Sequence, residues 1–213
     1  MSACVLLTVT PVAAQSRLDG VAAVVGAAAP GPNAEVVLLS DVELRARLSL
    51  LGALGDESEL SPLPRSLLRA TLSEIVGELL IAREARRLQA STPSAADVER
   101  ERVRILRAAG GQGRVSALLV ALSADDDELS AIARRRALVA AFLSANLEGV
   151  TDITEAALDQ ALANDPSLLA GRTREEVRVE LRTRMSREAL DRTIARWVAV
   201  LRARTEVHLY AEY

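Results

Sequence analysis

The acidic run Asp125–Glu128 offers four consecutive carboxylates, and carboxylate oxygens are ligands that calcium ions prefer. A calcium-binding loop spaces its ligands along the chain and contains a glycine, whereas these four acids are adjacent. The run follows Ser123, a residue type that caps helices, and negative charge in a first helical turn complements the helix dipole. The pattern therefore favours a helix that begins after Ser123 over a metal site.

Three consecutive arginines, residues 134–136, could contact phosphate groups. Consecutive residues of an α-helix point about 100° apart, so these side chains do not share one surface. The net charge of −3 also argues against a nucleic-acid partner, which normally needs a basic surface. We expect a solvated helical face that is partly paired with the acids before it; nucleic-acid contact is the alternative.

His208 is the single histidine of the sequence, and no cysteine or second histidine lies near it to indicate a zinc site. It falls in an alternating stretch, where we expect it on the solvent face of a strand. The glycines of Gly110–Gly113 lack the Lys that completes a phosphate-binding P-loop, so they indicate the end of a helix. We therefore predict no catalytic group, metal or cofactor, and we do not expect an enzyme.

The first fifteen residues form an uncharged, mostly apolar segment that contains the single cysteine, Cys4. Its small-residue end, VAA before Gln15, fits a signal-peptidase site, and the segment is too short to span a bilayer. Because the positive residues that open a secretory signal are missing, we predict a truncated signal peptide over 1–15. The mature domain, 16–213, would then have no cysteine and no stable insertion in a membrane.

The last residues, 205–213, alternate between apolar and polar side chains, as β-strands do. A lone strand is not stable in water, because its backbone donors and acceptors lack partners. Two short β-rich runs around a Pro- and Gly-containing turn, within 18–40, predict an N-terminal hairpin. Since no other strand is expected, we predict that the two ends of the chain pair in a small antiparallel sheet.

Between these ends, apolar residues recur with helical spacing, and capping residues mark the helix starts. Capping boxes are predicted at Ser40/Glu43 and Thr173/Glu176, and single caps at Thr92, Ser123 and Thr154. The expected helices end near residues 51, 89, 109, 122, 146, 163 and 203. The fold class is therefore mainly α, with about six to seven helices and one small antiparallel sheet, in a single domain.

The helix over 65–89 should lie at the centre of the core, because its apolar stripe is wide, and Met185 and Trp197 on the stripe of the longest helix are expected to be core residues. The helix over 65–89 has a stripe of Leu68, Leu72, Ile75, Leu79 and Ala82. The longest helix, over 174–203, has a stripe of Val177, Leu181, Met185, Leu190, Ile194, Trp197 and Leu201. Since the sequence has only four aromatic residues, the core must consist mainly of Leu, Val, Ile and Ala.

Four stretches of the sequence, taken in order, point to a family. They are VAAVVG…VVLLSDVELRARL, LRATLSEIVGELLIAREARRLQASTPSAADVERERVRIL, LSADDDELSAIARRRALVAAFL and TREEVRVELRTRMSREALDRTIARWVAVLRARTEVHLY. These stretches resemble the opening strand and helix, the core helix pair, a third helix and the returning helix and strand of the SurA-type periplasmic chaperones. The resemblance covers nearly all of residues 18–213.

The resemblance implies an ATP-independent chaperone of the periplasm that binds unfolded outer-membrane or secreted proteins. In that family a parvulin isomerase domain usually precedes the returning helix, but only residues 147–172 occupy that place here, too few for an isomerase fold. An interaction module for one defined envelope partner, or a degenerate peptidyl-prolyl isomerase, are the alternative functions.

A chaperone of this kind needs apolar surface on a stable frame. The short Leu-rich helix over 115–122 provides the candidate client contacts, Leu118, Leu119 and Leu122. Core packing of these three leucines is the alternative interpretation.

Overall fold

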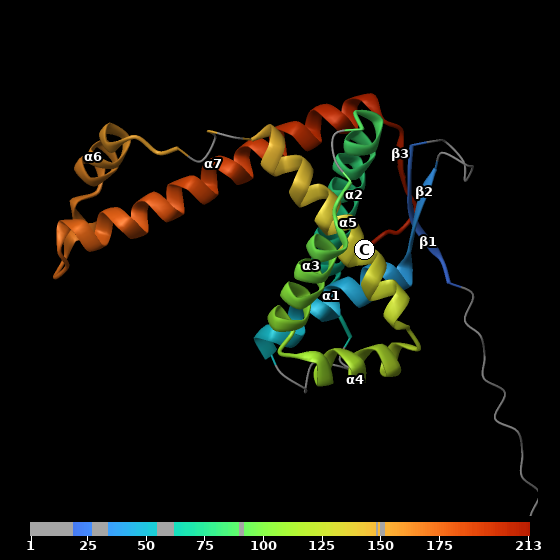
Figure 1. Ribbon diagram of the computed structural model, residues 1–213. Coiled ribbons are helices and arrows are strands. Elements are labelled where there is room, and N and C mark those ends of the chain that lie inside the picture. Colours follow the sequence, from blue (N-terminus) through green and yellow to red (C-terminus); the bar gives the residue numbers. More distant parts are fainter. Residues whose placement is uncertain (1–18, 27–33, 55–61, 90–91, 148, 150–151) are drawn as a thin grey trace, which may run out of the picture.

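The computed structural model describes residues 19–26, 34–54, 62–89, 92–147, 149 and 152–213. In these ranges the chain forms seven α-helices, one 3-10 helix and three strands (Figure 1). The expected signal peptide and the tip of the expected hairpin lie outside the described residues. Among the described helices, none has the combination of length and hydrophobicity that crossing a bilayer requires.

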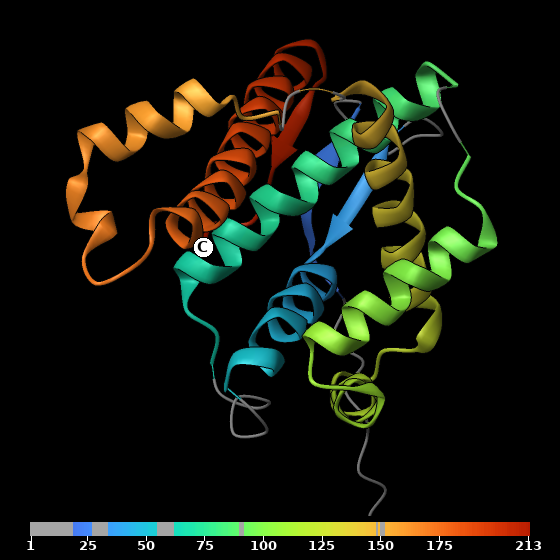
Figure 2. The same cartoon turned by 60° about the vertical axis from the view of Figure 1, so that its left-hand side comes forward.

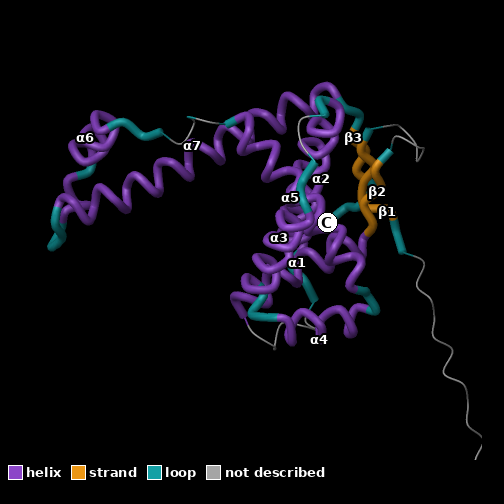
Figure 3. Tube along the Cα trace, in the orientation of Figure 1, coloured by secondary structure: helices purple, strands orange, loops and turns teal. Residues whose placement is uncertain are grey.

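Strand β1 (Val21–Val25) lies between β2 (Glu35–Leu38) and β3 (Val207–Leu209) in an antiparallel sheet. Its register with β3 places Ala23 opposite Leu209. The predicted pairing of the two ends of the chain is therefore confirmed. Figure 3 shows this sheet at one side of the helices.

The helices fill the sequence between β2 and β3, and with the sheet they confirm the predicted mainly α fold. They are α1 (Leu39–Leu54), α2 (Arg65–Arg87), α3 (Ala95–Ala108), α4 (Gln112–Leu122), α5 (Asp126–Asn146), α6 (Glu155–Asn164) and α7 (Arg174–Arg204), with the 3-10 helix η2 (Pro166–Leu169) after α6. The predicted caps Thr154 and Thr173 begin α6 and α7.

Three other predicted caps are wrong. Helix α3 begins after Ser94 instead of Thr92, because Ser94 forms a reciprocal capping box within its first turn. Helix α5 begins after Asp125, whose carboxylate accepts two backbone N–H bonds, while Ser123 ends α4 in the left-handed conformation. Ser40 lies inside α1, which continues directly from β2.

Three apolar clusters hold the fold together. The first joins the sheet to α2, α5 and α7, and the stacked rings of Phe142 and Trp197 lie in it with centroids 5.2 Å apart. The second joins α1, α3, α4 and α5 around Leu129 and Ile105. The third is confined to α6, η2 and the first half of α7. The first two clusters share α5 and form one body, whereas the third lies outside it.

Candidate functional site

A helical arm projects from the body in Figures 1 and 2. We define the arm as α6, η2 and the part of α7 from Arg174 to Glu188. Its small core consists of Leu158, Leu162, Val177 and Leu181, with Met185 packed against them. The described part of residues 147–172, the segment that the resemblance sets against an isomerase domain, thus forms a helix and a 3-10 turn folded onto α7.

Ion pairs fix α6 on α7. The Arg178 guanidinium donates to both Glu155 and Asp159, and its side chain is only 16% exposed. Arg174 also donates to Asp159, at 2.9 Å. The hydrogen bond from Arg178 lowers the pKa of Glu155 and of Asp159 below their usual values. Both carboxylates are therefore ionised at neutral pH. Their ion pairs with Arg174 and Arg178 connect α6 to α7.

The apolar stripe of α7 serves two separate cores. Val177, Leu181 and Met185 pack in the arm. Ile194, Trp197 and Leu201 pack in the body, which confirms Trp197 as a core residue. Leu190, the stripe residue between the two groups, belongs to neither cluster.

Leu190 instead lines a groove of about 600 Å³ where α5 ends and the arm departs from the body. We call it the junction groove. Its walls come from Ala140, Leu143, Ser144, Leu147, Gly149, Asp152 and Leu190. The three leucines are half-buried, and Asp152 is the charged residue among the described residues of the lining. An open groove with three leucines in its lining suits an apolar ligand of variable sequence.

The three leucines that the sequence predicts as client contacts lie elsewhere, in α4. Leu118 and Leu119 are buried in the second cluster, and Leu122 packs against it. In this conformation they contribute to the core and present little surface. Client binding by these residues stays a prediction that would require α4 to move.

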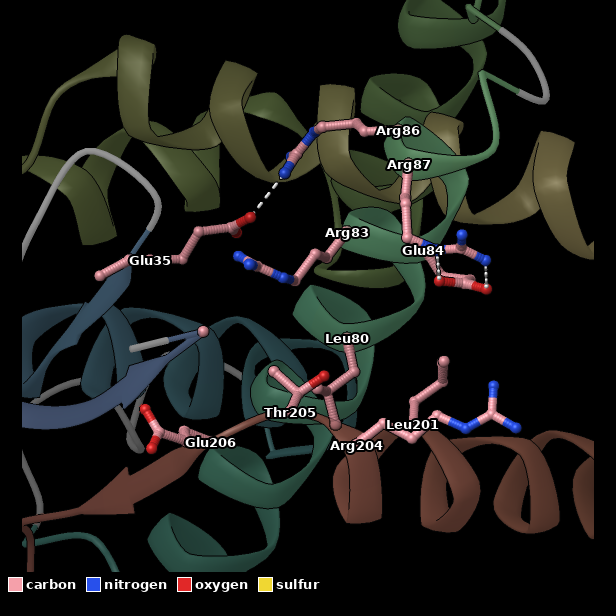
Figure 4. A pocket seen from close by; sticks show the side chains of 12 residues that line it. Glu35, Leu80, Arg83, Glu84, Arg86, Arg87, Leu201, Arg204, Thr205 and Glu206 are labelled. Atoms are coloured by element: carbon pink, nitrogen blue, oxygen red, sulfur yellow. Dashed lines mark hydrogen bonds and ion pairs between the residues drawn. The ribbon is translucent and has the colours of Figure 1, made fainter. Parts of the chain in front are cut away.

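A pocket of about 1100 Å³ lies between the C-terminal ends of α2 and α7 and the hairpin (Figure 4). Its wall is charged and contains several ion pairs. Arg87 donates two bonds of 2.7 Å to Glu84, and Arg86 reaches across to Glu35 at 2.5 Å. Leu80 and Leu201 add apolar surface to this wall, and the ion pairs occupy these four charged side chains.

The acidic run and two of the three consecutive arginines form ion pairs and a helix cap within the body. Asp125 caps α5, and Asp126 accepts two bonds from Arg102, so the acidic run forms the helix start that the sequence predicts. Arg135 and Arg136 pair with Glu78 of α2 and not with the preceding acids, because their side chains point into the body. The expected solvated face therefore holds for Arg134, which is exposed, and is wrong for Arg135 and Arg136.

His208 is also placed differently from the expectation. Its ring is half-buried, and its Nε2 atom is buried without a hydrogen-bond partner. Among the described residues, no cluster of His, Cys, Asp and Glu side chains has the arrangement to hold a metal ion. No protein-family model matches the sequence, and a search of curated proteins found no significant match.

Proposed function

We propose that this protein is an ATP-independent chaperone of the periplasm that holds unfolded envelope proteins in the junction groove. The observation that carries the proposal is Leu190, an apolar residue in the middle of a core-forming stripe that is left in an open groove. The resemblance to SurA-type chaperones supports the same function. No stable partner, nucleic acid or cofactor is part of the proposal.

The physical basis of the proposal is that an apolar groove accepts clients of many different sequences. Contacts to leucine side chains do not select a sequence, whereas a site of placed hydrogen bonds does. An unfolded client loses conformational entropy when it is held, so each contact is weak and release needs no nucleotide.

An aggregation assay tests the proposal. The protein from residue 16 onward, mixed with a urea-unfolded β-barrel protein on dilution, should delay light scattering at near-stoichiometric ratios. No delay over a wide range of ratios would reject the chaperone function. Capture of a single folded partner at fixed stoichiometry, with no effect on aggregation, would support an interaction module instead.

Substitution of the groove locates the activity. Leu190→Glu places a charge in the junction groove. It should abolish most of the delay in aggregation, because an apolar client would have to remove water from the new carboxylate when it binds. Val179→Glu is the matched control, since Val179 lies on the same helix, is 55% exposed and does not line the groove. Equal loss, or no loss, in both variants would place client binding elsewhere.

The isomerase alternative has a separate test. Residues 152–172 form α6, η2 and their connections, and Asp152 is the general acid or base among the described residues that line the groove. We expect the isomerisation rate of a proline-containing peptide to equal the uncatalysed rate. A rate above background that Asp152→Asn removes would support the isomerase.

A further inference from the structure

Three arginines converge on one carboxylate inside the body. Arg45 of α1 donates through Nη2 to Oε1 of Glu78 in α2. From α5, Arg135 Nε lies 3.4 Å from Glu78 Oε2, and Arg136 Nε lies 3.5 Å from Oε1. One carboxylate cannot balance three guanidinium groups, so the cluster has an excess of positive charge.

Arg45 is the buried member of this cluster. Its side chain is only 6% exposed, and its Nη1 atom is buried without a hydrogen-bond partner. Burial lowers the pKa of Arg45, and its two arginine neighbours act in the same direction, against the attraction of Glu78. Leaving a buried charged donor unpaired is costly, and native proteins rarely do so without a bound ligand or water.

A cavity of about 290 Å³ lies beside the cluster, between α1, α2, α3 and α5. Arg45 and Arg136 form its basic part, and Arg136 is the more accessible of the two at 34% exposed. Thr71, Ser49 and Glu74 are its other polar residues. Even with Glu74 counted, guanidinium groups outnumber carboxylates by three to two.

The remaining walls of the cavity are apolar: Leu48, Ile105, Ala108 and Ile132. Its volume lies at the lower limit of small-molecule sites, which is about 300 Å³. The cavity thus combines guanidinium donors with an apolar wall in a space that suits a group as small as one amino acid.

We propose that this cavity, the Arg45 cavity, binds a carboxylate that carries an apolar group, such as the C-terminal residue of a polypeptide or a free small organic acid. The planar guanidinium fork matches a carboxylate. Arg136 contacts the carboxylate at the mouth, Arg45 lies beneath it, and the apolar group packs on Leu48 and Ile132. The site lies in the body, apart from the junction groove, and does not depend on the proposed chaperone function.

Thermal unfolding with defined probes tests the site, because a ligand that binds the folded state raises Tm. At matched ionic strength, millimolar N-acetyl-leucine should raise Tm, whereas N-acetyl-leucinamide and inorganic phosphate should not. A ten-residue peptide that ends in a free leucine carboxylate identifies the source. If it also raises Tm and its amidated form does not, the ligand is a chain terminus; if only the short acid acts, it is a free acid.

Two neighbouring arginines provide the variants. Arg136→Gln should weaken the apparent affinity for N-acetyl-leucine at least about tenfold, the loss expected for one charge-assisted bond. Arg134→Gln, on the same helix but outside the cavity lining, should leave the affinity unchanged. Equal Tm shifts from acid and amide, an equal shift from phosphate, no shift from any probe, or an unchanged affinity in Arg136→Gln would overturn the proposal.

Discussion

At the scale of single residues, one glycine sets how closely two helices of the body approach each other. A Cβ atom at Gly52 of α1 would lie 1.9 Å from the backbone oxygen of Ala108 in α3. That oxygen is part of the main chain and cannot move away as a flexible side chain can. The contact between α1 and α3 therefore needs a residue without a side chain at this position.

Gly52→Ala should lower the free energy of unfolding by about 1–3 kcal/mol, because the added methyl group forces the two backbones apart. Gly113→Ala is the matched control, since a Cβ at Gly113 in α4 meets no atom within 4 Å. There the helix propensity of alanine should leave the protein unchanged or up to about 1 kcal/mol more stable. Urea unfolding of both variants measures these differences, and equal effects would contradict the close approach.

The arginine cluster illustrates which contacts a sequence conceals. Arg135 and Arg136 follow an acidic run, so local pairing was the natural expectation. Their partner, Glu78, lies 57 residues before Arg135 and is fixed by the packing of α2 on α5. A sequence gives the residue types of such a cluster, whereas its assembly depends on tertiary packing.

At the scale of elements, the arm is the feature that sequence reasoning did not predict. The α7 stripe was predicted as one continuous apolar stripe, without a division into two parts. It contains one irregular step, because Leu190 follows Met185 by five residues and not by three or four. This five-residue step coincides with the division between arm and body. It is the feature of the sequence that could have predicted the groove.

The arm should loosen in acid before the body does. Because Arg178 lowers the pKa of Glu155 and Asp159 in the folded arm, their stabilising contribution is present at neutral pH. It is lost as the pH falls through their folded-state pKa values, below the usual carboxyl range of about 4. Hydrogen exchange in α6 should therefore accelerate between about pH 5 and pH 3 relative to α5, and equal acceleration in both helices would contradict this.

A substitution at neutral pH should have the same effect on the arm. Arg178→Gln removes the guanidinium shared by Glu155 and Asp159, so hydrogen exchange in α6 should accelerate at pH 7. Arg184→Gln is the control, because Arg184 is 53% exposed and makes only a long pair with Glu188 on its own helix. Equal exchange rates in α6 of the two variants would show that packing alone holds the arm.

At the scale of the whole molecule, the sequence predicted the helical class, the hairpin and the closing strand. These features follow from periodicity and from the rule that a strand needs a partner, so they do not depend on details of packing. Cap positions were less predictable, since Thr92/Ser94 and Ser123/Asp125 offer competing capping side chains within two residues. The division into arm and body depends on which helix faces pack against each other. The periodicity of apolar residues shows that a helix has an apolar face, but it does not show which helix covers that face.

Strand β3 should stabilise the body through Val207. Val207→Asp should lower the free energy of unfolding by about 2 kcal/mol or more, because Val207 packs against the first cluster. Leu209→Asp, in the same strand but 52% exposed, should change it by less than about 1 kcal/mol. The fluorescence of Trp197 in urea reports both transitions, and equal destabilisation would contradict a selective role for the inner residue.

The pairing of Ala23 with Leu209 also determines when the protein can fold. A ribosome delivers the chain from its N-terminus. Strand β1, the central strand of the sheet, therefore emerges long before its second neighbour, β3. Until the last strand is released, one edge of β1 is unpaired and can associate with other nascent chains. The three-stranded sheet can therefore be completed only after residue 209 has been translated.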